Sequence, residues 1–122
     1  MPKKRIMVVD DNEAIRAVLG TSLKLLLPDC QIRAVGNGDA ALTELRQQPF
    51  DLVLTDYNMP RMNGVELAEH IRAARADIKC LYTSGYTGKA LTERGLGEAG
   101  ASLLTKPFTT QSITEAVRQA MR

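Results

Sequence analysis

Five short apolar segments alternate with helix-like patterns along this chain of 122 residues, and this alternation limits how the chain can fold more than any other feature. The segments are rich in β-branched and other apolar residues, and a turn signal or a helical pattern follows each one. They cover residues 5–9, 31–35, 51–55, 79–83 and 101–105. Strands joined through helices run parallel, because such a connection crosses over the sheet before the next strand begins.

Helical patterns fill the gaps between these segments. Apolar residues at helical spacing predict four helices, which contain Ile15 to Leu26 before Pro28, Ala40 to Leu45 before Pro49, Val65 to Ile71, and Ile113 to Met121. A weaker pattern covers residues 88–96, and glycines at 88, 95, 97 and 100 would each cost roughly 1 kcal/mol of helix there. We expect this fifth helix to be short or frayed, and mobile. The order of elements predicts an α/β fold, with one parallel sheet covered by helices on both faces.

The composition suits one domain spanning residues 1–122 and argues against several classes of protein. No apolar run approaches the ~18 residues of a membrane span, and the N-terminal apolar stretch is too short for a signal peptide, so we expect a cytoplasmic protein without membrane insertion. A net charge of +2 is too balanced to indicate direct nucleic acid binding. Cys30 and Cys80 form no CxxC pattern and are expected to be reduced thiols in the packing.

Polar residues stand at the ends of four of the five predicted strands. They are Asp10 and Asp11 after the first strand, Asp56 after the third, Ser84 after the fourth and Lys106 after the fifth. Ligands of open parallel sheets bind beyond the carboxyl ends of the strands, so these residues predict a site. Taken singly, Asp10 or Asp11 could cap the first helix together with Glu13. Asp56 could belong to a turn formed around Pro60.

The three aspartates together favour a bound cation. Neighbouring strands lie ~4.8 Å apart, and two carboxylates at about that distance repel each other by roughly 3 kcal/mol at an effective dielectric constant near 20. Mg²⁺ suits such an all-oxygen site, whereas the lack of His and Cys in the group argues against zinc or copper. A cation beside a carboxylate, a hydroxyl and a lysine indicates phosphoryl transfer, with Asp56 as the natural nucleophile.

Four motifs in this order resemble the receiver domain of bacterial two-component response regulators, the CheY-like family. They are VVDD at 8–11, LTDYNMPRMNG at 54–64, YTSGY at 82–86 and TKPF at 105–108, and the resemblance covers nearly the whole chain. It implies a doubly wound, flavodoxin-like (βα)5 fold with a five-stranded parallel sheet in the order 2-1-3-4-5.

The resemblance also implies a role for each site residue. Asp56 would accept a phosphoryl group from a histidine, and Asp11, Asp56 and the backbone carbonyl of Asn58 would bind Mg²⁺, with Asp10 acting largely through water. Lys106 would bind the phosphoryl group, and its peptide bond to Pro107 would be cis. Ser84 would swing to a phosphoryl oxygen on activation, and Gly85 would leave room for the phosphate.

Two positions leave alternatives open. The family usually has Tyr or Phe three residues before the lysine, where this chain has Leu103, so the chain departs from the family at the aromatic part of the switch. Leu103 is either an exposed apolar anchor for a partner or an ordinary packing residue. Tyr86 either screens the acyl phosphate from water, which would slow its hydrolysis, or simply covers the end of the sheet.

Other functions make demands that the sequence does not meet. A haloacid-dehalogenase-type phosphatase needs a second carboxylate two residues after the nucleophile, where this chain has Asn58. A dinucleotide or flavin binder needs a glycine-rich turn after the first strand, where this chain has DDNE. The only histidine, His70, is expected on a helix surface rather than as a phosphotransfer group. We therefore expect a switch that catalyses only its own phosphorylation and dephosphorylation.

The expected partners follow from the resemblance. A histidine kinase or a histidine phosphotransfer protein would dock on the first helix and the loop after the fifth strand, where Ala14, Ile15, Val18 and Phe108 offer apolar contacts. Output would pass by onward phosphotransfer, or to an unknown downstream protein on the face of helix four, strand five and helix five, from a monomer or a phosphorylation-dependent dimer. The Met1 start favours a stand-alone regulator, although SGYTGKAL also resembles receivers detached from hybrid histidine kinases.

Overall fold

The computed structural model describes residues 4–56, 62, 64–74, 78–84, 102–105 and 109–120, with the backbone alone at Val65, Ser84 and 102–105. The strands in this part of the chain are β1 (Arg5–Val9), β2 (Gln31–Val35), β3 (Leu52–Asp56), β4 (Lys79–Ser84) and β5 (Ser102–Thr105). The helices are α1 (Glu13–Leu26), α2 (Gly38–Gln47), α3 (Gly64–Ala74) and α5 (Thr110–Ala120). The fifth helix predicted over residues 88–96, with its predicted mobility, lies outside the described residues.

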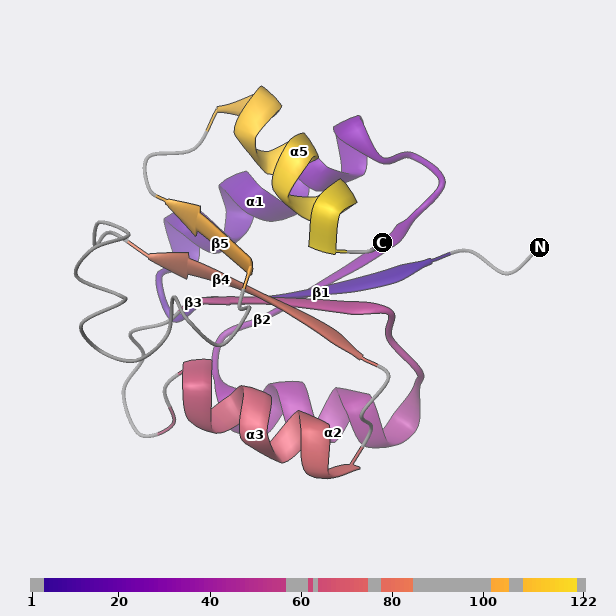
Figure 1. Ribbon diagram of the computed structural model, residues 1–122, viewed down its shortest axis with the longest axis vertical. Helices are drawn as coiled ribbons and strands as arrows, with labels where there is room; N and C mark the ends of the chain where they lie inside the picture. The colour runs from indigo at the N-terminus through magenta and orange to yellow at the C-terminus, as the bar shows by residue number, and fades with distance from the viewer. Residues whose placement is uncertain are drawn as a thin grey trace.

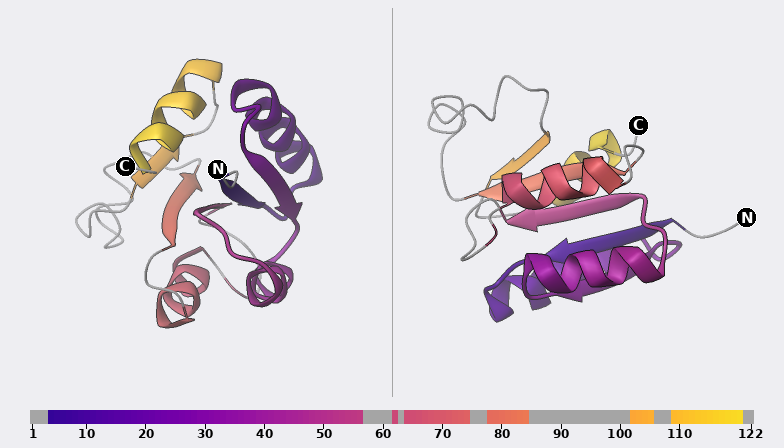
Figure 2. Two further views of the ribbon diagram at one scale, coloured as in Figure 1. Left: turned by 90° about the vertical axis from the view of Figure 1, so that its right-hand side faces the viewer. Right: turned by 90° about the horizontal axis from the view of Figure 1, so that it is seen from below.

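The five strands form one parallel sheet in the order β2-β1-β3-β4-β5. Helices α1 and α5 cover one face of the sheet, and α2 and α3 cover the other (Figure 1). The same three layers are visible when the molecule is turned (Figure 2). The predicted strand order and the predicted double winding are therefore confirmed.

Alternation along the central strands divides the core into two halves. On β1, Ile6 and Val8 pack with α1 and α5, whereas Met7 and Val9 pack on the other side with α2 and α3. Successive side chains of a strand point to opposite faces, and helices cover both faces here, so the strand reads as a continuous apolar run. All four side chains are buried. Burying each one stabilises the fold by about 1.5–3 kcal/mol relative to leaving it exposed.

Strand β3 lies one residue later than the sequence pattern predicts. Asp51 sits in a bend at the start of the strand, where its carboxylate accepts the backbone N–H of Arg5 at 2.8 Å. At the other end, Asp56 pairs in register with Thr83 of β4 and is therefore part of the sheet. The aspartate expected just beyond the strand is its last residue, so the sheet fixes the position of its backbone.

The residue that caps α1 is Asn12, not Asp10 or Asp11. The Asn12 side-chain oxygen accepts the backbone N–H of Ile15 at 3.1 Å. An amide side chain caps a helix as well as a carboxylate does. The two aspartates before Asn12 are therefore not needed as caps, and the capping explanation for them is wrong.

The two cysteines are free thiols on opposite sides of the sheet, as expected from their spacing. Burial raises the pKa of both thiols, and the charge of nearby Asp29 adds to this effect at Cys30. His70 is exposed on α3, as the sequence predicts. Among the described helices, none is both long enough and apolar enough to cross a membrane.

Candidate functional site

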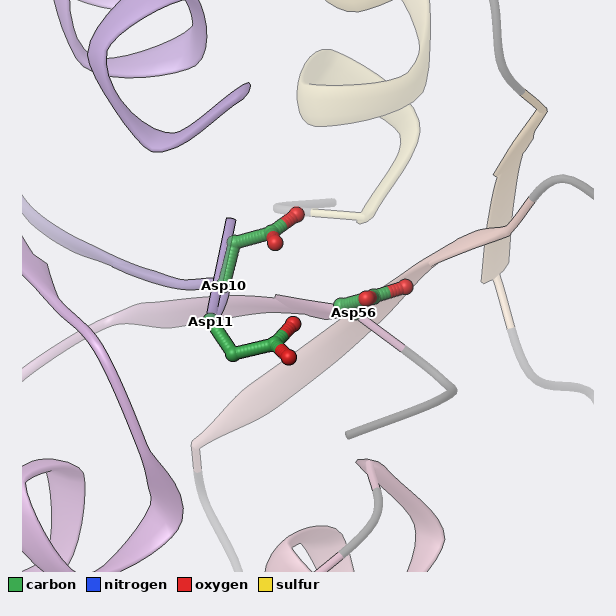
Figure 3. A group of neighbouring side chains, drawn as sticks. All are labelled: Asp10, Asp11 and Asp56. Carbon is green, nitrogen blue, oxygen red and sulfur yellow. The ribbon is translucent and has the colours of Figure 1, made fainter. Parts of the chain in front are cut away.

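Three aspartates meet where β1 and β3 end. Asp10 and Asp11 follow β1, and Asp56 is the last residue of β3, the strand paired directly with β1. Each residue offers a carboxylate oxygen, and these three oxygens lie within 4.8 Å of one another. The three side chains extend to the same side of the strand ends, from two strands far apart in the sequence (Figure 3). The predicted acidic cluster is therefore present in the fold.

The three carboxylates differ in exposure and in support. Asp10 is fully buried, and its Oδ1 accepts the backbone N–H of Asn12 at 2.9 Å. Its own backbone N–H donates to the carbonyl of Val35 at 3.2 Å, so both its side chain and its main chain are held. Asp56 is 7% exposed, and Asp11 is exposed to solvent. The cluster thus has one fixed interior carboxylate, one at the sheet end, and one that faces water.

The donor set fits Mg²⁺. Metal–oxygen distances of about 2.0–2.1 Å place any two ligand oxygens of one ion no more than about 4.2 Å apart. Oxygens within 4.8 Å of one another need only small side-chain movements to reach that arrangement. Mg²⁺ typically takes one or two carboxylates and keeps several waters, and the exposed side of Asp11 gives water access to the site.

A buried hydroxyl beside the cluster was missed by the sequence analysis, which singled out Ser84. Thr83 is 1% exposed and lies opposite Asp56 in the register of β3 and β4, so both side chains are on the same face of the sheet. Its Oγ1 has no hydrogen-bond partner among the residues that the structure describes. Only the register of β4 against β3 reveals this neighbour, because 27 residues separate the two positions in the chain.

The remaining predicted site residues are only partly described. Ser84 is the last residue of β4 and pairs with Thr105 of β5, and Leu103 pairs with Tyr82. The structure gives only the backbone of Ser84 and Leu103. Asn58, Gly85, Tyr86, Lys106 and Pro107 lie outside the described residues. The roles predicted for these seven residues therefore stay predictions.

The fold and the cluster together define the class of protein. It is a doubly wound α/β protein with an acidic site beyond the carboxyl ends of neighbouring parallel strands, which is where ligands bind in such sheets. Within this class, the chain belongs to the response regulator receiver domain family, whose sequence pattern it matches over residues 6–118. Receiver domains are signalling modules, and the chain is thus a phosphoacceptor module of two-component signalling. Family membership decides against the phosphatase and dinucleotide-binding alternatives.

Individual relatives show how far the similarity extends. The chain is 29% identical to the response regulator receiver protein CpdR of Brucella abortus over 118 residues, which are 97% of each protein. It is 36% identical to a protein-glutamate methylesterase/protein-glutamine glutaminase of a Nocardioides species over 129 residues, but spans only 34% of that protein. The solved receiver domain of the hybrid histidine kinase CckA matches with a TM-score of 0.78 and 25% identity, covering 97% of this chain and 99% of the other.

Proposed function

We propose that Asp56 is the phosphoacceptor and that Asp11 and Asp56 bind Mg²⁺ directly, with Asp10 acting largely through water. The observation that carries this proposal is the meeting of three carboxylate oxygens within 4.8 Å at the ends of β1 and β3. When bound, Mg²⁺ supplies positive charge that offsets the carboxylates and the oxygens of the incoming phosphoryl group.

The support of each aspartate favours Asp56 as the nucleophile. Asp10 is fully buried and already accepts a backbone N–H, so an incoming phosphoryl group has poor access to it. Asp11 lies outside the strand and faces solvent, so its side chain has room to move and bind a cation. Asp56 is held in the β3–β4 ladder yet keeps some exposure. A carboxylate with a fixed backbone is preorganised for in-line attack.

In the proposed reaction, a carboxylate oxygen of Asp56 forms a bond to phosphorus while the bond from phosphorus to a donor histidine nitrogen breaks. The bonding electrons return to the histidine ring. Lys106 and Ser84 would bind oxygens of the transferred group, and the Asn58 carbonyl would complete the ligand set. Gly85 and Pro107 would shape the site. Tyr86 and Leu103 keep the two alternative roles that the sequence analysis gives for each of them.

The donor would be a histidine kinase or a histidine phosphotransfer protein that docks on α1. Two large apolar side chains are exposed on this helix: Val18 is 56% exposed and Leu25 is 77% exposed. Ala14 is also exposed, whereas Ile15 is half-buried and packs against the core, so Ile15 contributes less to a docking surface than the sequence suggested. Phe108 lies outside the described residues.

The output belongs to the same proposal. The chain would act as one receiver domain in the cytoplasm, with no catalytic activity beyond its own phosphorylation and dephosphorylation, and would signal to a protein partner or pass the phosphoryl group on. The similarity to the CckA receiver favours a second candidate setting, in which the chain is the receiver of a hybrid histidine kinase. Mg²⁺ would be required in either setting.

The test is the intact mass after incubation with acetyl phosphate, with and without Mg²⁺. The wild type should gain one phosphoryl group only when Mg²⁺ is present, and Asp56→Asn should gain none. Asp51→Asn is a matched control, because Asp51 precedes the same strand at its opposite end. An adduct of equal yield on Asp56→Asn, or loss of the adduct in Asp51→Asn alone, would show that Asp56 is not the acceptor.

A further inference from the structure

The guanidinium group of Arg16 contacts the backbone of Asp10, next to the acidic site, and the proposed reaction does not use it. Arg16 lies in the first turns of α1, where its backbone N–H donates to the carbonyl of Asn12 at 2.9 Å. Its side chain turns back towards the end of β1, and Nη1 donates to the backbone carbonyl of Asp10 at 2.8 Å. The side chain is half-buried, and it makes no ion pair with a carboxylate among the described residues.

Gly36, in the turn after β2, leaves room for the same guanidinium. A Cβ atom placed on Gly36 would lie 3.1 Å from Nη1 and 3.7 Å from Cζ of Arg16, so the guanidinium occupies space that a larger residue would need. The backbone of Gly36 is not in the left-handed region, so a substitution there would meet the guanidinium without added backbone strain. Its neighbour Val35 accepts the N–H of Asp10. Arg16 therefore joins the turn after β1 to the turn after β2.

We propose that Arg16 is a positioning residue of the metal site. Its guanidinium, anchored in α1 and seated against Gly36, holds the Asp10 carbonyl and so fixes the turn that directs the Asp10 and Asp11 carboxylates towards Asp56. A planar guanidinium has five N–H donors in a rigid arrangement, so it can hold one carbonyl while packing against a second loop. This inference rests on the proposed binding of Mg²⁺ by the three aspartates.

The sign of the effect separates positioning from simple charge. A cation near a metal site repels the incoming Mg²⁺, so removing a positive charge should strengthen binding if charge were the only role of Arg16. If Arg16 positions the carboxylates, removing it should weaken binding, because supporting residues of metal ligands commonly change affinity by about 10–100-fold. The two roles thus predict opposite changes in the Mg²⁺ dissociation constant.

The experiment measures Mg²⁺ binding to the full chain by isothermal titration calorimetry, without any phosphoryl donor. Arg16→Met keeps the apolar stem and removes the guanidinium, and we expect its dissociation constant for Mg²⁺ to rise by about tenfold or more. Lys24→Met removes a positive charge from the exposed surface of the same helix and should leave binding unchanged. Urea unfolding in EDTA shows whether each variant is folded.

Gly36→Ala tests the same idea without removing the arginine. Its methyl group would lie 3.1 Å from Nη1, so the guanidinium would have to shift by a few tenths of an ångström. Mg²⁺ affinity should therefore fall in the wild-type background and stay constant in the Arg16→Met background. If Arg16→Met does not fold, Gly36→Ala in the wild-type background carries the test by itself: weaker Mg²⁺ binding supports the positioning role, and unchanged or tighter binding overturns it. Unchanged or tighter binding by Arg16→Met, or an equal effect of Gly36→Ala in both backgrounds, would overturn the positioning role. A wild type that binds no Mg²⁺ would instead overturn the proposed function, and the positioning role with it.

Discussion

Replacing Asp11 by asparagine removes one negative charge from the acidic cluster, and without Mg²⁺ the protein should become more stable. Asp10 and Asp11 are adjacent in the sequence, so their mutual repulsion persists in the unfolded chain. The repulsion between Asp11 and Asp56 exists only in the folded state, with oxygens no more than 4.8 Å apart. Coulomb's law gives about 3.5 kcal/mol for that distance at an effective dielectric constant of 20, and about 0.9 kcal/mol at that of water.

The exposure of Asp11 places the expected gain near the lower end of this range. We expect Asp11→Asn to raise the free energy of unfolding by about 1–2 kcal/mol in EDTA at low salt. The assay is urea unfolding followed by circular dichroism. In 1 M salt the Debye length falls to about 3 Å, so the gain should shrink. Mg²⁺ at about 100 times its dissociation constant should stabilise the wild type by about 2.7 kcal/mol, and Asp11→Asn by clearly less, because a ligand is missing.

Asp39→Asn is the matched control for this prediction. Asp39 is an exposed aspartate in the first turn of α2, outside the cluster, where a negative charge interacts favourably with the helix N-terminus. Its replacement should therefore lower the stability, by about 0.3–1 kcal/mol. The reasoning fails if Asp11→Asn is neutral or destabilising in EDTA at low salt, or if Mg²⁺ stabilises this variant as much as the wild type.

Two further predictions concern packing and pH. Gly38→Ala would place a methyl group 2.6 Å from the sulfur of Met62, so it should destabilise the protein by about 1–3 kcal/mol despite the better helix propensity of alanine. Urea unfolding in the Met62→Ala background checks this cause. There, Gly38→Ala should no longer lower the free energy of unfolding. Burial raises the pKa of the Cys80 thiol, so this thiol stays neutral in the folded state at pH values where the unfolded chain already ionises. The free energy of unfolding should therefore fall as the pH rises through the ordinary thiol range, and a fall of the same size in Cys80→Ala would contradict that cause.

The sequence predicted the architecture because its signals are local. Strands buried on both faces appear in the sequence as short apolar runs, as RIMVV does. Helices are indicated by the spacing of apolar residues and by a following proline, as before Pro28. The bounds of β3 differ by one residue from the prediction. Residues 51–55 and 52–56 have nearly the same apolar pattern, and only the pairing of Asp56 with Thr83 shows that β3 extends to Asp56.

The residue types of the acidic site were also visible in the sequence. Asp10, Asp11 and Asp56 end strands that a parallel sheet brings together, so their meeting followed from topology alone. The alternative that Asp10 or Asp11 caps α1 could not be decided from the sequence, because Asp10, Asp11 and Asn12 are all suitable capping residues and only the direction of each side chain separates them. Exposure on α1 was equally hidden, since Ile15 and Val18 have similar hydropathy and differ only in what packs against them.

What the sequence determined by itself is therefore the order of elements, the layers around the sheet and the chemistry gathered at one end of it, because these depend on residue type and spacing. Tertiary structure alone decided two contacts between distant segments that the sequence did not predict. The hydroxyl of Thr83 beside Asp56 and the seat of the Arg16 guanidinium against Gly36 depend on strand register and on side-chain direction. Neither leaves a periodic trace in the sequence, because each forms only when the sheet and its helices have packed.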